Sequence, residues 1–191
     1  ELPKTSLKMD TIHLVYDSLQ AFEHFAEEVH FSFRTLPSQI TLKDISPFVP
    51  VLSHFKEPIT LDMEVKGTVD QLNCSHLEIV SEEQQFRLRG DVSLQDLSHP
   101  QDAYVYGTLS ELSANTRGVG FLVRNLNPDY NGVPPILERL GNISFRGEIS
   151  GYFTDLVTYG QLRTSLGDVK TDLKLSADKS KGLFAYSGAV K

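Results

Sequence analysis

One alternating segment sets the pattern of the chain: Ile59-Thr60-Leu61-Asp62-Met63-Glu64-Val65-Lys66-Gly67-Thr68-Val69-Asp70-Gln71-Leu72. Its odd positions, from 59 to 69, carry Ile, Leu, Met, Val, Gly and Val, whereas its even positions, from 60 to 70, carry Thr, Asp, Glu, Lys, Thr and Asp. Successive side chains of a β-strand point to opposite faces of the sheet. The segment therefore predicts a strand with one apolar face and one polar face.

The same pattern returns at four other places in the chain. It is clear in residues 86–94, 143–153 and 184–190, and it has a weaker form in residues 103–109, where tyrosines occupy the face that should be polar. Self-similarity of this kind is sought first, because a missed repeat leads to the wrong fold. The chain is therefore predicted to repeat one sheet-forming unit.

Each repeat carries a glycine in register with its apolar side chains. A glycine inside a strand marks a bend, a bulge or the close approach of another group, and large sheets are curved with such glycines. The glycines predicted to shape the sheet are Gly67, Gly90, Gly107, Gly147, Gly151 and Gly188.

The two halves of the chain align when Gly67 is set against Gly151, and further along, residues 86–92 match residues 184–190. The second copy stops at Lys191 where the first continues, so the chain is expected to be part of a longer one.

This alignment predicts three parts. Residues 1–45 hold N-terminal strands and a short helix, and residues 46–115 form a first unit of a helix followed by four strands. Residues 116–191 form a second, truncated unit of the same kind.

Four short helical segments interrupt the strands. Apolar residues at i, i+3, i+4 and i+7 occur in residues 22–29, 48–55 and 119–126, and residues 134–141 begin with prolines and end with a glycine,. Strands recur about every ten residues between them, which is typical of an antiparallel meander. The predicted fold class is mainly β, with repeated antiparallel meanders forming an elongated, curled, partly open (taco-like) sheet and a few short helices.

The composition is that of an ordinary folded protein of 191 residues, with 40% hydrophobic and 23% charged residues,. The formal net charge is -7, and no cluster of Lys and Arg interleaves with aromatic residues. A phosphate backbone is therefore not expected as the main partner, which argues against nucleic acid.

The sequence contains no stretch of about 18 consecutive apolar residues and no signal-peptide pattern. A signal or a membrane anchor is therefore expected outside these residues. Cys74 is the single cysteine and has no partner for an internal disulfide, so cysteine usage leaves the redox compartment open,.

A longer ordered motif runs through the second half of the chain. It consists of Pro135-Ile136-Leu137-x-x-Leu140-Gly141-x-Ile143-x-Phe145-x-Gly147-x-Ile149-x-Gly151-x-Phe153, followed by Thr164-x-Leu166-Gly167 and Asp172-Leu173. This order resembles the AsmA-like proteins, and within them the TamB group, the translocation and assembly module subunit of Gram-negative envelopes. Ile40-x-Leu42-x-Asp44-Ile45-x-Pro47-Phe48-Val49-Pro50 is similar to the segment that precedes a repeat there, so the resemblance covers most of residues 36–191.

The resemblance implies a large periplasmic protein anchored in the inner membrane by an N-terminal helix outside this chain. Such proteins are long curled sheets with an apolar trough, associated with lipid transport to the outer membrane or with outer-membrane protein assembly. A TamB-like protein would partner an outer-membrane barrel protein, through parts of the chain that are not present here.

The apolar face is expected to bind phospholipid or other acyl chains, because few helices are available to cover it. Binding would come from apolar burial at about 0.8 kcal/mol per CH₂, without directional bonds, so the chains could slide. The predicted lining residues are Leu61, Met63, Val65, Val69, Phe86, Leu88, Val92, Phe145, Ile149, Phe153, Phe184 and Tyr186.

Two other functions fit the same fold class. The apolar residues could form a closed core, in which case the segment is a scaffold or chaperone surface whose open strand edge accepts client strands by β-augmentation. A carbohydrate-binding β domain would need exposed aromatic platforms, for which the sequence offers only Tyr104 and Tyr106.

Nothing in the sequence predicts an enzyme, a cofactor or a metal. The six histidines show no HxH or HExxH spacing, and neither a GxSxG elbow nor a P-loop occurs,. Carboxylates such as Asp62 and Glu148 alternate with apolar residues and are expected on the wet face of the sheet,.

One segment comes close to a calcium loop. Asn127-x-Asp129-x-Asn131-Gly132-x5-Glu138 departs from the usual spacing only at its first position,. Pro134 and Pro135 remove backbone donors from such a loop and favour a turn that leads into a helix. The segment is predicted to bind no calcium.

Overall fold

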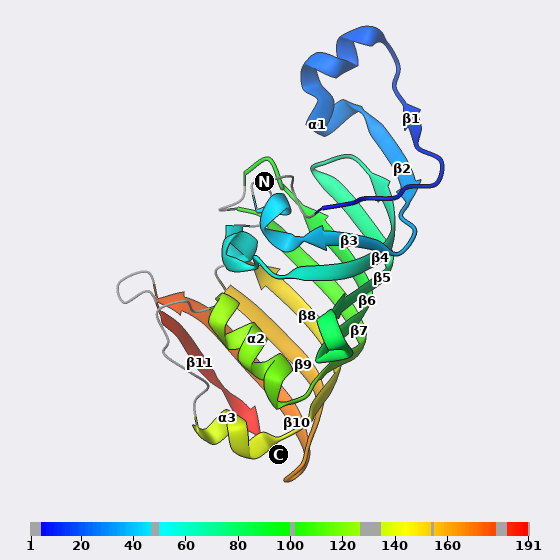
Figure 1. The fold of residues 1–191 in the computed structure, drawn as a ribbon. Coiled ribbons are helices and arrows are strands. Elements are labelled where there is room, and N and C mark those ends of the chain that lie inside the picture. Colours follow the sequence, from blue (N-terminus) through cyan, green and yellow to red (C-terminus); the bar gives the residue numbers. More distant parts are fainter. Residues whose placement is uncertain are drawn as a thin grey trace.

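The chain forms one large antiparallel meander (Figure 1). The computed structural model describes residues 5–46, 50–99, 102–126, 135–153, 155–178 and 183–190. Ten strands follow one another across the sheet in the order β1-β2-β4-β5-β6-β7-β8-β9-β10-β11, and β3 pairs with β4 beside this path. The predicted mainly β meander with a few short helices is confirmed.

The strands are β1 (His13–Val15), β2 (His30–Arg34), β3 (Ser38–Thr41), β4 (Pro58–Gly67), β5 (Gln71–Ser81), β6 (Phe86–Gln95), β7 (Tyr104–Ala114), β8 (Ile143–Tyr152), β9 (Asp155–Thr164), β10 (Gly167–Asp178) and β11 (Leu183–Val190). The helical segments are η1 (Leu19–His24), α1 (Phe25–Glu28), η2 (Leu42–Ile45), η3 (Pro50–His54), η4 (Glu82–Gln84), α2 (Thr116–Leu126) and α3 (Pro135–Leu140).

The helices predicted after residue 115 are present as α2 and α3, and α3 ends before Gly141, whose φ is +63°. The N-terminal predictions are less accurate. The strand expected there is reduced to the three residues of β1, and the helix expected over residues 22–29 is the short pair η1 and α1. Short stripes of this kind cannot hold a full helix without a surface that covers them.

The register gives Gly67 and Gly151 equivalent positions. Gly67 pairs with Leu72 and Gly151 pairs with Leu156, so each glycine stands at the same place in its unit. Gly67 has φ +125° and Gly151 has φ +132°, and an added Cβ would lie 2.0 Å from the Gln71 carbonyl oxygen and 2.2 Å from that of Asp155, respectively. These two glycines therefore turn the chain into the next strand.

The second part of the alignment matches two strands that have different positions in the order of their units. Residues 86–92 lie on β6, the third strand of the first unit, whereas residues 184–190 lie on β11, the fourth strand of the second. Their similarity reflects a shared alternation with a central glycine.

The sheet is neither closed nor strongly curled, so the curled form expected from the glycines is not reached in this segment. The glycines serve close strand contacts instead. An added Cβ at Gly90 would lie 2.3 Å from the Thr108 carbonyl oxygen of the neighbouring strand, and one at Gly147 would lie 2.0 Å from that of Tyr159.

A compact core closes one end of the apolar face. Helix α2 and the turn η3 pack there, and the Phe121 ring lies 5.5 Å from Phe55 and 6.1 Å from Phe86. Asn125 of α2 is 4% exposed and donates hydrogen bonds to Glu57 Oε2 at 2.9 Å and to the Phe121 carbonyl at 2.7 Å. The buried members of the core are Ile40, Leu42, Phe55, Ile59, Leu61, Phe86, Ala114, Val119 and Phe121.

We predict that Gly118→Ala destabilises the fold, although alanine normally stabilises a helix by about 1 kcal/mol relative to glycine. Gly118 is buried on α2, and an added Cβ would lie 1.9 Å from the Gln85 backbone oxygen. The expected loss is about 2 kcal/mol in the free energy of unfolding, measured by urea denaturation. Arg117→Ala, at a side chain that is 78% exposed, is the control and should change little.

Candidate functional site

The register aligns residues of successive strands into three mainly apolar rows on one face of the sheet, which we call the apolar face. The helix-side row consists of Leu61, Ile79, Leu88, Leu112, Phe145, Leu162 and Val169. The middle row consists of Val65, Cys74, Val92, Gly107, Ile149, Thr158 and Leu173. The turn-side row consists of Gly67, Leu72, Leu94, Val105, Gly151, Leu156 and Leu175.

Most of the predicted lining residues fall on these rows or directly beside them. Leu61, Leu88 and Phe145 belong to the helix-side row, and Val65, Val92 and Ile149 belong to the middle row. Phe86 lies at the end of the same face, paired with Ala114, and Met63 lies on β4 between Leu61 and Val65.

Two predicted residues are misplaced. Val69 and Phe153 lie in the turns that follow β4 and β8, because Gly67 and Gly151 bend the chain just before them. Both side chains are half-buried. On β11, Gly188 pairs with Leu173, Tyr186 pairs with Leu175 and Phe184 pairs with Ala177. The structure describes the backbone of β11 but not its side chains.

Burial divides the apolar face. Leu61, Phe86 and Phe145 are 4%, 5% and 9% exposed, and they contact the core under α2 or lie beside it. The middle row is buried at Val65 and Cys74 but only half-buried at Val92, Ile149, Thr158 and Leu173. On β4 to β7, the part of the apolar face next to the helices is therefore a packed core. On β8 to β10 the apolar face is partly open.

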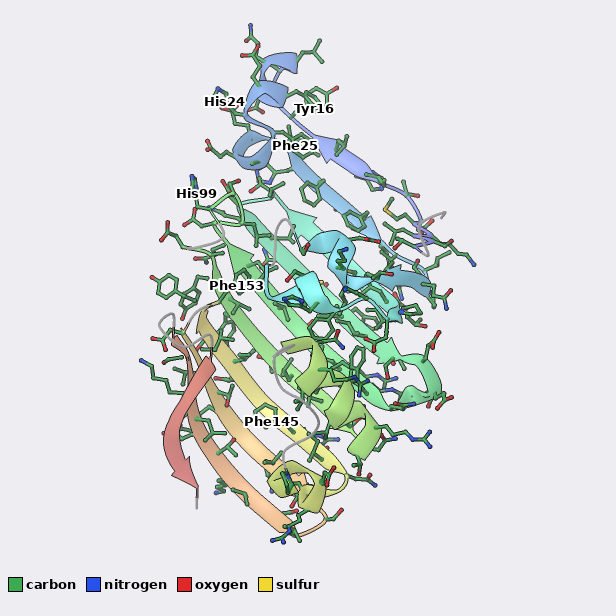
Figure 2. The ribbon with its side chains drawn as sticks, turned by 60° about the vertical axis from the view of Figure 1, so that its left-hand side comes forward. Tyr16, His24, Phe25, His99, Phe145 and Phe153 are labelled. Carbon is green, nitrogen blue, oxygen red and sulfur yellow. The ribbon has the colours of Figure 1, made fainter. Side chains whose placement is uncertain are left out.

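Phe145 has a structural role that its pattern did not reveal. It lies over a pair of facing glycines, Gly147 and Gly160, and an added Cβ on either one would come within 2.8 Å and 2.7 Å of its ring, respectively. The ring fills the space that the two missing side chains leave. Figure 2 shows Phe145 and Phe153 toward opposite ends of β8.

Cys74 is a packed side chain and not a nucleophile. Burial and, secondarily, the nearby Asp91 carboxylate raise the pKa of its thiol from 9.0 to about 11. Its sulfur lies 3.6 Å from the Met63 sulfur. A thiol that stays protonated at neutral pH has little reactivity.

The apolar face extends onto β2 of the N-terminal hairpin, which consists of β1 and β2 joined by η1 and α1. The predicted lining residues did not include this hairpin. Phe33 pairs with Val65 and Phe31 pairs with Gly67, so both rings lie on the apolar face. From Phe31 the aromatic contacts continue outward, at centroid distances of 4.9 to 6.4 Å, through Phe25, Phe22 and Tyr16. Figures 1 and 2 show this hairpin projecting from one end of the sheet.

The concavities of the described surface are polar. One concavity, of about 790 Å³, is lined mainly by residues of β5, β6 and the nearby turns, including Asn73, Ser93 and Gln95. Three smaller ones, of about 430, 350 and 320 Å³, lie among polar residues elsewhere. None of these four concavities contains a predicted lining residue.

Within the described residues no group of three or more His, Cys, Asp or Glu side chains is arranged to hold a metal ion. Residues 127–134 of the segment that resembles a calcium loop lie outside the described residues, and its last part forms α3. The prediction that it binds no calcium therefore stands as a prediction.

No family model, curated protein sequence or solved structure matches the chain. Among the described helices, none has the length and apolar character needed to cross a bilayer.

We predict that Ile149→Asp damages the fold far more than Glu148→Ala. Ile149 is half-buried in the middle row, whereas Glu148 is exposed on the opposite face. Placing an unpaired carboxylate among apolar side chains costs about 2 kcal/mol or more, whereas an exposed substitution usually stays within about 0.5 kcal/mol. Equal melting temperatures for the two variants would show that the faces are assigned wrongly.

We also predict that the native Cys74 thiol reacts with iodoacetamide at least about tenfold more slowly than the denatured chain at pH 8.5. The pKa of the thiol is about 11 in the native state, compared with 9.0 ordinarily. At a pH between these two values the native state therefore keeps the thiol proton, whereas the unfolded chain loses it. The free energy of unfolding should therefore fall as pH rises from 9 to 11. In Cys74→Ala, this component of the pH dependence should disappear.

Proposed function

We propose that this chain is a non-enzymatic, lipid-handling segment of a large cell-envelope protein, whose apolar face binds phospholipid or other acyl chains. The observation that carries the proposal is the alignment of three apolar rows across β4 to β10, of which the helices close only one end. A one-sided apolar sheet must be covered by something.

The dimensions of the rows suit an acyl chain. Neighbouring strands lie about 4.8 Å apart, so a row over the seven strands β4 to β10 is about 29 Å long. One acyl chain spans a single leaflet, about half of the ~30 Å hydrocarbon core of a bilayer, so a row is long enough to hold a whole chain. Each buried CH₂ contributes about 0.8 kcal/mol. Because this attraction has no preferred direction, a chain could move along a row without breaking specific bonds.

The half-buried residues of β8 to β10 are the proposed contact surface. Ile149, Leu156, Leu162 and Leu173 all belong to the rows and all keep part of their surface accessible. On the same face, the aromatic rings of Phe31 and Phe33 continue the apolar surface onto β2, beyond β4. A chain that binds here would lie across the strands.

The cellular role is proposed from the sequence resemblance to the TamB group. In that setting the segment would be periplasmic, in a protein anchored to the inner membrane. It would help to move lipid to the outer membrane or help in the assembly of the outer membrane. Further repeats on either side would add strands, and the accumulated twist would curl the sheet into a trough. An outer-membrane barrel protein would be contacted by other parts of that protein.

A second candidate is a scaffold or chaperone surface. It is favoured by the burial of Leu61 and Phe86, two predicted lining residues that belong to a closed core. In that case the sheet would offer its strand edges to client strands by β-augmentation, and no lipid would be needed.

Native mass spectrometry of the purified chain, followed by lipid extraction, separates the two candidates. We predict bound phospholipid in the wild-type protein and a reduction of about fivefold or more in Leu162→Asn, because this change removes apolar surface from the helix-side row. Arg163→Asn is the matched control, since Arg163 is the exposed neighbour on the opposite face and should leave lipid binding unchanged.

Absence of any lipid from the wild-type protein, together with capture of extended peptides at a strand edge, would favour the scaffold. Equal lipid loss in both variants would show that the lipid does not lie on the apolar face. Melting temperatures of all three proteins establish whether each variant is folded.

A further inference from the structure

Four tyrosines gather on the face of the sheet opposite the apolar rows, which we call the polar face. Tyr104 and Tyr106 come from β7, Tyr152 comes from β8 and Tyr159 comes from β9. Three of them are strongly exposed, with Tyr106 at 47%, Tyr152 at 50% and Tyr159 at 61%. Exposed aromatic clusters of this kind on a polar surface mark interaction sites.

The register places these rings on adjacent strands. Tyr104 pairs directly with Tyr152, and the two rings meet edge to face at 5.3 Å. Tyr106 is two residues along β7, and Tyr159 pairs with Glu148 on β8. Because side chains of one face repeat every second residue, all four tyrosines lie on the polar face over β7 to β9, and we call this set the tyrosine platform.

A concavity adjoins this platform at the turn end of β5 and β6, where Leu72 and Leu94 of the turn-side row line it together with polar residues. Gln95 pairs with Tyr104 and Ser93 pairs with Tyr106, and both line the 790 Å³ concavity together with Asn73. The Ser93 hydroxyl donates to the Asn73 side-chain oxygen at 2.8 Å, which fixes one edge of the amide. Aromatic rings and a set of amide and hydroxyl groups therefore meet at the boundary between β6 and β7.

The strands beside Tyr159 carry charges of both signs on the polar face, because the exposed Arg146 and Lys170 lie two residues from Glu148 and Asp172, respectively. Tyr159 is flanked on both sides by carboxylates, because it pairs with Glu148 on β8 and with Asp172 on β10. The nearby Lys174 is held by Asp155 at 2.9 Å. A sulfate or phosphate bound directly over Tyr159 would lie between these two carboxylates and be disfavoured, whereas hydroxyl groups at the same place would find hydrogen-bond acceptors.

We propose that the tyrosine platform and the adjoining concavity form a binding site for neutral saccharides. The apolar faces of sugar rings stack on Tyr106, Tyr152 and Tyr159, while sugar hydroxyls bond to the amides of Gln95 and Asn73 and to the Glu148 carboxylate. Tyrosine suits this role because it offers a large rigid apolar surface with a polar tip. The site lies on the opposite face from the acyl chains, so it does not depend on the proposed lipid-handling function.

The experiment begins with an array of neutral oligosaccharides, covering glucans, galactans, mannans and N-acetylhexosamine polymers, and their sulfated counterparts. The best neutral glycan is then titrated into the protein while the intrinsic fluorescence is followed. Because the chain has 7 Tyr and no Trp, this signal comes from tyrosine. We expect binding of a neutral glycan, a change in tyrosine fluorescence, and weaker or no binding of the sulfated form.

Tyr106→Ala and Tyr159→Ala should each lower the affinity about tenfold, because each removes one stacking surface. The matched control is Tyr16→Ala, which removes a ring that is 42% exposed on the N-terminal hairpin and should leave the affinity unchanged. Gln95→Ala tests the concavity and should also weaken binding. Melting temperatures close to that of the wild type show that the variants are folded.

Failure of every neutral glycan to bind the wild-type protein overturns the proposal, as does stronger binding of the sulfated forms. An equal loss of affinity in Tyr16→Ala would place the glycan elsewhere. If Tyr106→Ala abolishes a self-association that sedimentation detects in the wild type and leaves glycan binding intact, the platform is an interface between copies of the chain.

Discussion

The apolar rows stay in line because a bulge in β5 and a bulge in β7 each accommodate one more residue than the neighbouring strands have. From the middle row to the helix-side row, β4, β6, β8, β9 and β10 each advance four residues, whereas β5 advances five, from Cys74 to Ile79, and β7 advances five, from Gly107 to Leu112. With side chains alternating every residue, an odd step would put the far end of the strand on the wrong face. A bulge in each strand absorbs the extra residue and restores the face.

The bulge in β5 shows how the backbone is satisfied at such a point. His76 has φ +56°, and its N–H, which has no place in the ladder, donates to the Asp91 carboxylate at 3.1 Å. Because His76 is exposed, this contact orients the backbone at the bulge rather than satisfying a buried donor. The register on which both faces of the sheet depend is therefore supported by a polar contact on the polar face.

The sequence predicted the alternation and the meander, since strict alternation around residues 59–67 and 143–151 has only one plausible structure. The sequence also carried a signal for the bulges. The spacing between apolar positions is three residues instead of two from Cys74 to Leu77 on β5 and from Leu109 to Leu112 on β7. Such three-residue steps were not used in the prediction. They are the signal that would have placed the rows correctly along both strands.

Coverage of the apolar face could not be predicted from the pattern. An apolar side chain has the same place in the alternation whether a helix or a ligand covers it, so Leu61 and Ile149 look equivalent in sequence although only Leu61 lies in the helical core. The turn positions of Val69 and Phe153 also depend on glycine conformations that alternation does not encode. The tyrosines were noticed only in part, because Tyr104 and Tyr106 are neighbours in sequence whereas Tyr152 and Tyr159 join them through register alone.

The same register gives the two faces of the sheet different chemistry in the same place. Val105, which lies between Tyr104 and Tyr106, is 8% exposed on the apolar face, while Tyr106 is 47% exposed on the polar one. A one-residue slip of β7 would bury the tyrosine hydroxyls, at a cost of about 1 to 3 kcal/mol for each one left without a partner, and would expose the valine. The apolar rows and the tyrosine platform are therefore mutually dependent, because any change of register that removes one also removes the other.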